Sequence, residues 1–307
     1  MYKLDIPEIE SPLYPRRKEA TEYSPDLDRN RIISLNNEYH AKGYEVMDLL
    51  SPGECDQIIQ EVDSIISSGD FKFQNKGYQY SDSPRVFEAW KQSRAVLEAA
   101  RHPKILERLE QMYGRKPLPF QTINFKKGSN QPLHSDVIHF HTMPHRWVVG
   151  VWIALEDMDE YNGTLRYVPG SHTLPIYELQ DLGIDKVDPQ LPKEDMDREQ
   201  VEKYRSYEMF IDNLVWSMKL KEELFLARKG QALLWMANLL HGGAPIRDPQ
   251  RTRWSQATHY YFEGCEHYYA PMFSNPRRGE YAEKDLSKKD ILNHIIEVNR
   301  ELIHDFE

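Results

Sequence analysis

A histidine and an aspartate separated by one residue, His134 and Asp136, have the residue types and spacing of a metal site. Side chains two positions apart in an extended chain point to the same side, so both can reach one ion. His241 follows the mostly apolar run 233–240 and would lie at a strand end. Two histidines and one carboxylate form the facial ligand set of non-haem Fe(II) oxygenases. The sequence therefore predicts an iron site formed by His134, Asp136 and His241.

An arginine further along the chain, Arg253, could bind the far carboxylate of a keto acid that chelates this iron. A guanidinium can form two parallel hydrogen bonds with a carboxylate. Arg247 and Arg251 are competitors, but they lie in a connection containing Pro and Asp, where arginines are commonly exposed. Arg253 begins the predicted strand that runs back along the site and is therefore preferred. Gly242 and Gly243, directly after the distal histidine, would let a ligand approach closely.

Three further histidines, His139, His141 and His145, follow the first pair of ligands closely. A cluster of this kind also suits zinc, so a zinc hydrolase stays as an alternative function. We expect these histidines in a loop over the mouth of the site, in contact with substrate, with the metal ligands or with solvent. His139 and His141 are the candidate substrate contacts, and His139 is preferred because it lies three residues after Asp136.

Taken together, these motifs resemble the phytanoyl-CoA dioxygenase family, which also includes ectoine hydroxylase. The resemblance runs from about residue 39 to residue 269, and the order and spacing of its pieces make it specific. The matching pieces are His134-x-Asp136, the strand around Trp152, Asn162-Gly163, the turn Val168-Pro169-Gly170-Ser171-His172, His241-Gly242, and Arg253 followed by His259-Tyr260.

The resemblance implies a mainly β fold with flanking helices and a double-stranded β-helix core of the jelly-roll, cupin-like kind. It also implies Fe(II), 2-oxoglutarate as co-substrate and dioxygen, with ascorbate as a candidate addition. His134, Asp136 and His241 would be the catalytic iron ligands. Arg253 would bind the distal carboxylate of 2-oxoglutarate, and Trp152 would line its pocket.

Two polar residues on the strand before the motif, Asn124 and Gln121, are further candidates for contact with the keto acid. One position departs from the family pattern, because the second residue after His241 is often Ser in the family and is Gly243 here. This departure weakens the case for a hydroxyl contact to 2-oxoglutarate at that point.

The reaction implied by the resemblance is hydroxylation of an unactivated carbon, coupled to decarboxylation of 2-oxoglutarate to succinate. Asp136 favours hydroxylation, because related halogenases have a small residue in place of the carboxylate so that chloride can bind iron. The substrate would be a small metabolite or a biosynthetic intermediate. A non-catalytic, 2-oxoglutarate-binding regulatory protein of the same fold is the main alternative.

The composition limits the partners. A net charge of -10 and a pI near 5.7 argue against nucleic acid and anionic membranes, which require a basic face. Two distant cysteines give no disulfide framework, and the N-terminus lacks the apolar segment of a signal peptide. We expect a cytoplasmic protein, monomeric or homodimeric, acting on a small molecule. The longest apolar runs are about half of a membrane-spanning length.

Residue patterns predict one domain over 29–307, preceded by an arm over 1–28. Helical spacing of apolar residues predicts helices starting at Ser51 and around 105–113. Strand-like runs, rich in β-branched and aromatic residues, begin near Pro117, and Asn162-Gly163 would form a tight hairpin turn between two of them. The segment 171–230 would be a lid insertion with a helix from about 198, and 286–306 an amphipathic closing helix. The strand-like runs are 120–125, 147–155, 164–168, 232–235 and 254–262.

Overall fold

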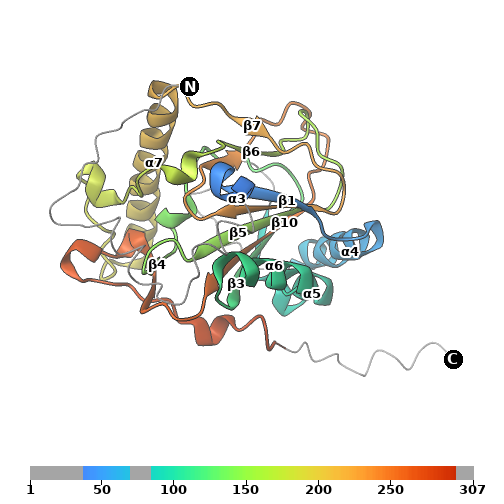
Figure 1. Cartoon of the computed structure of the whole chain (residues 1–307), viewed down its shortest axis with the longest axis horizontal. Coiled ribbons are helices and arrows are strands. Elements are labelled where there is room, and N and C mark those ends of the chain that lie inside the picture. Colours follow the sequence, from blue (N-terminus) through green and yellow to red (C-terminus); the bar gives the residue numbers. More distant parts are fainter. Residues whose placement is uncertain (1–36, 70–83, 295–307) are drawn as a thin grey trace.

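A six-stranded antiparallel sheet forms the larger half of the core in the computed structural model, which describes residues 37–69 and 84–294. Its strand order is β1-β8-β5-β10-β3-β2. The structure contains all the predicted strands. β5 and β10 lie at the centre of the six-stranded sheet (Figure 1). The bounds are β1 Tyr44–Asp48, β2 Arg85–Phe87, β3 Pro117–Phe125, β5 Val148–Ala154, β8 Gln231–Met236 and β10 Ser255–Phe262.

A smaller sheet of three strands, in the order β7-β6-β9, faces the inner side of the large one. Its strands are β7 Glu223–Leu224, β6 Leu165–Tyr167 and β9 His241–Gly243, and a separate pair joins β4 His141–Met143 to β11 His267–Tyr269. Two facing antiparallel sheets make the jelly roll that the sequence predicted. The hairpin predicted at Asn162-Gly163 is wrong, because β6 pairs with β7 and β9 and not with β5. That turn carries the chain from one sheet to the other.

Side chains alternate between the two faces of β5, as the two-residue period of a strand requires. Val149, Val151 and Ile153 face outward into the largest cluster of buried apolar side chains. Trp152 and Ala154 face inward, into the cluster between the two sheets. The inner face therefore supplies both the barrel interior and the wall of the site.

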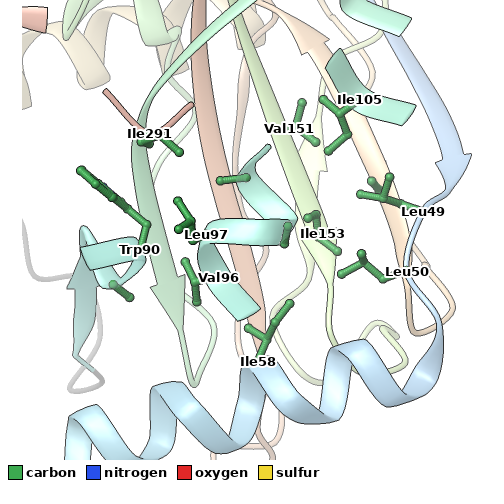
Figure 2. Close-up of a cluster of buried hydrophobic side chains, with 14 of the residues drawn as sticks. Leu49, Leu50, Ile58, Trp90, Val96, Leu97, Ile105, Val151, Ile153 and Ile291 are labelled. Atoms are coloured by element: carbon green, nitrogen blue, oxygen red, sulfur yellow. The ribbon is translucent and has the colours of Figure 1, made fainter. Parts of the chain in front are cut away.

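Three helices cover the outer face of the large sheet: α4 Pro52–Ser68, α5 Arg94–Ala100 and α6 Pro103–Tyr113. Figure 2 shows Ile58, Val96, Leu97 and Ile105 from these helices in one buried cluster with Val151 and Ile153 of β5. The predicted start of α4 is confirmed, with Ser51 and Glu54 forming a reciprocal capping box. Gly114 ends α6 in the left-handed conformation, which glycine adopts without steric cost.

The segment predicted as an insertion contains α7, Lys193–Ser217, which begins about five residues earlier than expected. Figure 1 places α7 on the side of the core away from α4, α5 and α6. The second half of α7 is anchored by Tyr207, Ile211 and Val215, which are buried among apolar neighbours. Its first half lines a cavity. Short elements elsewhere are α3 Asn37–Lys42, η1 Ala89–Lys91, η2 Asp136–Ile138, η3 Ser171–Thr173, η4 Leu179–Leu182, η5 Pro271–Phe273 and η6 Pro276–Arg278.

The C-terminal region differs from the expected amphipathic helix in the part that the structure describes. Leu286–Lys289 form the single 3-10 turn η7, in which the Asp285 side chain accepts a hydrogen bond from the Ser287 amide, and Ile291 is buried. The remainder of the predicted helix and the predicted arm over 1–28 lie outside the described residues. Over 37–69 and 84–294, no helix is both long and apolar enough to span a bilayer.

A glycine on β5, Gly150, lies against the Trp235 indole on β8, its partner in the sheet register. A Cβ at Gly150 would come within 2.2 Å of two ring atoms of that indole. Gly150→Ala is therefore expected to displace the ring and to lower the free energy of unfolding by about 1–3 kcal/mol. Urea denaturation measures this loss. Gly53→Ala, where a Cβ meets nothing within 4 Å, is the control and should not destabilise the chain.

Candidate active site

The two histidines of the predicted site are brought together by backbone pairing. His134 and His241 form an antiparallel bridge, with reciprocal N–H to O=C hydrogen bonds of 2.9 and 3.0 Å. Asp136 starts η2 immediately afterwards. One ligand atom from each of the three side chains lies within 4.8 Å of the others, and all three residues are buried. The structure thus assembles a two-histidine, one-carboxylate set of the facial kind.

Both imidazoles are oriented by main-chain carbonyls. His134 Nδ1 donates to Pro132 O at 2.9 Å, and His241 Nδ1 donates to Leu239 O at 2.9 Å. Each bond fixes the tautomer that leaves Nε2 with its lone pair, which is how proteins prepare histidines for metals. Burial and the neighbouring His241 imidazole lower the pKa of His134 well below its usual value. His134 is therefore neutral and able to ligate at neutral pH.

The Asp136 carboxylate is held from two sides. Its Oδ1 faces the two ligand histidines, 4.0 Å from His134 Nε2 and 3.6 Å from His241 Nε2. Its Oδ2 accepts a 2.8 Å hydrogen bond from Trp235 Nε1 and lies 3.5 Å from His259 Nε2. Burial opposes ionisation, but the His241 and His259 imidazoles keep the pKa of Asp136 well below its usual range. Asp136 is an anion with one oxygen directed at the histidine pair.

The two glycines after His241 allow close packing of the chain segment that leads to His134. A Cβ on Gly242 would lie 2.7 Å from the carbonyl oxygens of Gln131 and Pro132, and one on Gly243 would lie 2.5 Å from Ser129 Oγ. The glycines line the cavity, as expected, but backbone approach is what requires them. Ser129 also lines the cavity, so its hydroxyl occupies the region where a residue-243 side chain would project.

Arg253 is a buried cation that has no carboxylate partner among the described residues. Its Nη1 donates to Ser255 Oγ at 2.8 Å, and its Nε has no hydrogen-bond partner. The guanidinium lies 5.3 Å from the centroid of the Trp152 ring and 5.1 Å from that of Phe125. Burial and the nearby Arg85 lower the pKa of Arg253 to about 9. A buried cation without a carboxylate partner would be stabilised by an anionic ligand.

One cavity of about 1470 Å³ contains both the ligand triad and Arg253. Its deeper walls come from the inner face of the large sheet, including Gln121, Trp152 and His259, and its outer wall is the first half of α7. An ion at the triad and an anion at Arg253 would therefore share one cavity.

Comparison with known proteins identifies the family. The family model for phytanoyl-CoA dioxygenase (PhyH) matches residues 39–254, well over half of the chain. The chain belongs to the phytanoyl-CoA dioxygenase family. Ectoine dioxygenase from Nocardia farcinica is 28% identical over 213 residues, which are 66% of this chain and 68% of that protein. Peroxisomal phytanoyl-CoA dioxygenase of Rattus norvegicus is 28% identical over 122 residues, covering 35% of this chain and 36% of the rat protein.

Solved structures of Fe/2-oxoglutarate oxygenases share the fold. The epimerase SnoN, solved in complex with Fe3+, alpha ketoglutarate and nogalamycin RO, superposes with a TM-score of 0.57 at 19% identity, covering 84% of this chain and 97% of SnoN. EctD from S. alaskensis with bound Fe gives 0.56 at 18% identity, covering 84% and 86%. These likenesses confirm the predicted jelly-roll core.

Two residues proposed from the sequence do not reach the cavity of this phytanoyl-CoA dioxygenase family member. Asn124 points to the outer face of β3, where its amide donates to Gln256 Oε1 at 3.3 Å, and the predicted keto acid contact is not possible from there. His141 is fully buried beside Tyr269 and accepts a hydrogen bond from the Arg146 amide, so a substrate contact is also wrong for it. His139 and Gln121 do line the cavity.

The cavity residues that received no role from the sequence include Trp235, His259, Gln131 and Tyr204. Two of them carried a signal. His259 belonged to the family motif, and strand alternation places Trp235 on the inward face with Leu233. Gln131 and Tyr204 gave none beyond their types, because their contacts depend on how α7 packs over the barrel.

The Trp235 indole supports the metal site through its hydrogen bond to Asp136. Trp235→Phe is expected to weaken Co(II) binding about 10- to 100-fold, the usual cost of losing a group that orients a metal ligand. Visible absorption titration measures the affinity. Trp254→Phe, a buried tryptophan in the outer apolar cluster, controls for general loosening and should bind Co(II) normally. Equal affinities for both variants would show that the Trp235 bond has no role in metal binding.

Proposed function

We propose that this chain is an Fe(II)- and 2-oxoglutarate-dependent hydroxylase acting on an unactivated carbon of a small, polar metabolite. The observation that carries the proposal is the pairing, in one cavity, of a facial His134–Asp136–His241 set with the buried, carboxylate-free Arg253. The His134–Asp136–His241 set suits Fe(II). Arg253 suits the second carboxylate of a dicarboxylate whose other end binds the iron. Family membership supports both assignments.

The donor set fits iron by its chemistry. Two neutral imidazole nitrogens and one carboxylate suit Fe(II), and the arrangement of all three on one side leaves further positions for exogenous ligands. The orienting bonds from Pro132, Leu239 and Trp235 are what an occupied site requires. Related structures of EctD were solved with Fe and with 2-oxoglutarate.

Arg253 fits the distal carboxylate of 2-oxoglutarate. Its unpartnered Nε offers a donor that a carboxylate oxygen could accept, and Trp152 and Phe125 exclude water around it. In such low-dielectric surroundings, a charge-assisted hydrogen bond is stronger than on the surface. Ser129 is placed to contribute a hydroxyl from the segment beside Gly243.

Iron bound with 2-oxoglutarate and dioxygen supplies an oxidant that places one oxygen atom on a substrate carbon and the other in succinate, with release of carbon dioxide. The residues of the chain orient this chemistry. His134, Asp136 and His241 would hold the ion, and Arg253 would fix the direction of 2-oxoglutarate. Because Asp136 occupies its ligand position with a carboxylate, the site favours hydroxylation over halogenation. His139, part of the wall near His134, would contact substrate.

The outer wall of the cavity points to a polar substrate. Along the first half of α7, three basic side chains (Lys193, Arg198, Arg205) and three acidic ones (Glu194, Asp197, Glu202) line the cavity. A long alkyl chain would leave these charges without solvent, which is costly. The phosphates of a CoA thioester would require an excess of cations that this wall does not have. The equal numbers of basic and acidic side chains along this α7 wall favour a neutral or zwitterionic metabolite.

The decisive experiment is anaerobic reconstitution with Fe(II) and 2-oxoglutarate, followed by admission of oxygen. We expect a metal-to-ligand absorption band that needs both components, and then more than one equivalent of succinate per protein. The absence of the band would overturn the proposal. A band with no succinate beyond one equivalent would instead indicate a 2-oxoglutarate-binding regulator. Protein purified without added iron that holds only zinc and is inactive with Fe(II) would favour a hydrolase.

A further inference from the structure

Gln131 connects α7 to a predicted metal ligand. Its Nε2 donates to Tyr204 Oη at 2.9 Å and lies 3.2 Å from His134 Nε2. Its Oε1 accepts a 3.1 Å hydrogen bond from Arg85 Nη2. One side chain thus contacts α7, a predicted metal ligand and strand β2 of the large sheet.

The direction of each bond follows from the chemistry of the partners. An arginine only donates, so Arg85 requires the amide oxygen of Gln131, and the amide nitrogen must then face Tyr204 and His134. Because His134 Nδ1 already donates to Pro132 O, His134 Nε2 is an acceptor. Gln131 therefore donates to the lone pair with which His134 would bind a metal. The two uses of that lone pair exclude each other.

Tyr204 lies between the first half of α7, which lines the cavity, and the second half, which packs in an apolar cluster. Residues 193–205 contribute the polar wall of the cavity, whereas Tyr207 and Ile211 anchor the following turns in an apolar cluster. Tyr204 itself is fully buried, and its ring centroid is 4.6 Å from that of His139. A molecule pressed against the first half of α7 would therefore act on the residue that holds the Gln131 amide.

We propose that Gln131 is a positioning residue that couples α7 to the metal site: its amide is shared between Tyr204 and the metal-binding nitrogen of His134. This inference rests on the proposed function, because it takes the triad to bind a metal. As a consequence, the position of α7 determines the free energy needed to break the hydrogen bond between the Gln131 amide and His134 Nε2. A substrate that contacts α7 would in this way change how the ion is bound, although the substrate does not contact the ion.

A double-mutant cycle with Co(II) tests the coupling in the full-length chain. We expect Gln131→Leu to tighten Co(II) binding about 2- to 10-fold, because one hydrogen bond no longer has to be broken. Tyr204→Phe should change the Co(II) affinity and the visible Co(II) spectrum in the wild-type background and change neither in the Gln131→Leu background. Such non-additivity is the signature of a shared interaction. Ser206→Ala, at an exposed α7 residue outside the cavity lining, should leave both readouts unchanged.

The failures can be told apart. Wild-type protein that does not bind Co(II) through the triad would overturn the proposed function. Wild-type binding with additive or absent effects of Gln131→Leu and Tyr204→Phe would overturn the coupling alone. If Tyr204→Phe does not fold, as judged by circular dichroism, Arg85→Met replaces it in the cycle. Arg85→Met frees the opposite end of the same amide and should also lose its effect in the Gln131→Leu background.

Discussion

Asp136→Asn is expected to abolish 2-oxoglutarate turnover and to weaken metal binding at least about a hundredfold. Loss of an outer partner of a metal ligand alone costs about 10- to 100-fold, and this change removes the ligand's charge itself. The amide keeps the shape of the side chain and can still accept from Trp235 Nε1. However, it presents a neutral group to the His134 and His241 Nε2 atoms that Asp136 Oδ1 now faces. Co(II) titration and succinate release measure the two effects.

Asp159→Asn is the matched control, because Asp159 is a carboxylate paired with Arg251 and does not line the cavity. Its metal affinity and turnover should equal those of the wild type. Full metal affinity in Asp136→Asn would mean that the ion binds elsewhere. The triad would then have to be abandoned, together with the assignment of Fe(II) to it.

The convergence of His134, Asp136 and His241 was predictable because its signal is local and chemical, although the geometry has a different origin from the one expected. The His-x-Asp spacing predicted two side chains on one side of an extended strand. In the structure His134 pairs with His241, Ser135 caps the next element, and Asp136 already belongs to a 3-10 turn. The three side chains converge because the chain turns at Asp136, directly after the bridge between His134 and His241.

The error at Asn124 could have been avoided from the sequence. Asn124 and Gln121 are three residues apart on one strand, and side chains an odd number apart face opposite sides of a sheet. Only one of them could reach the cavity, and the structure shows that it is Gln121. The roles of Gln131 and Tyr204 could not be predicted, because they depend on where α7 packs. No periodicity within the insertion carries that information.

Arg253→Met is expected to weaken binding of 2-oxoglutarate by about thirtyfold to several thousandfold. Loss of one partner from a buried, hydrogen-bonded ion pair costs about 2–5 kcal/mol, and 1.4 kcal/mol is a factor of ten. Methionine retains much of the apolar stem that packs against Trp152 and Phe125. Isothermal titration of the metal-loaded protein with 2-oxoglutarate measures the change. Arg251→Met, at a half-buried arginine paired with Asp159 outside the cavity lining, is the control and should bind normally.

The same substitution should leave the stability of the ligand-free protein unchanged or raise it. Burial lowers the pKa of Arg253 to about 9, so below that pH the ligand-free fold contains an uncompensated buried cation, which methionine removes. Since only the cation attracts a carboxylate, wild-type affinity for 2-oxoglutarate should fall as the pH rises through about 9, and Arg253→Met should lose this step. Thermal unfolding of the ligand-free proteins tests the first part. A marked loss of stability in Arg253→Met would show that the guanidinium supports the fold, and its assignment to 2-oxoglutarate would then rest on the affinity and its pH dependence alone.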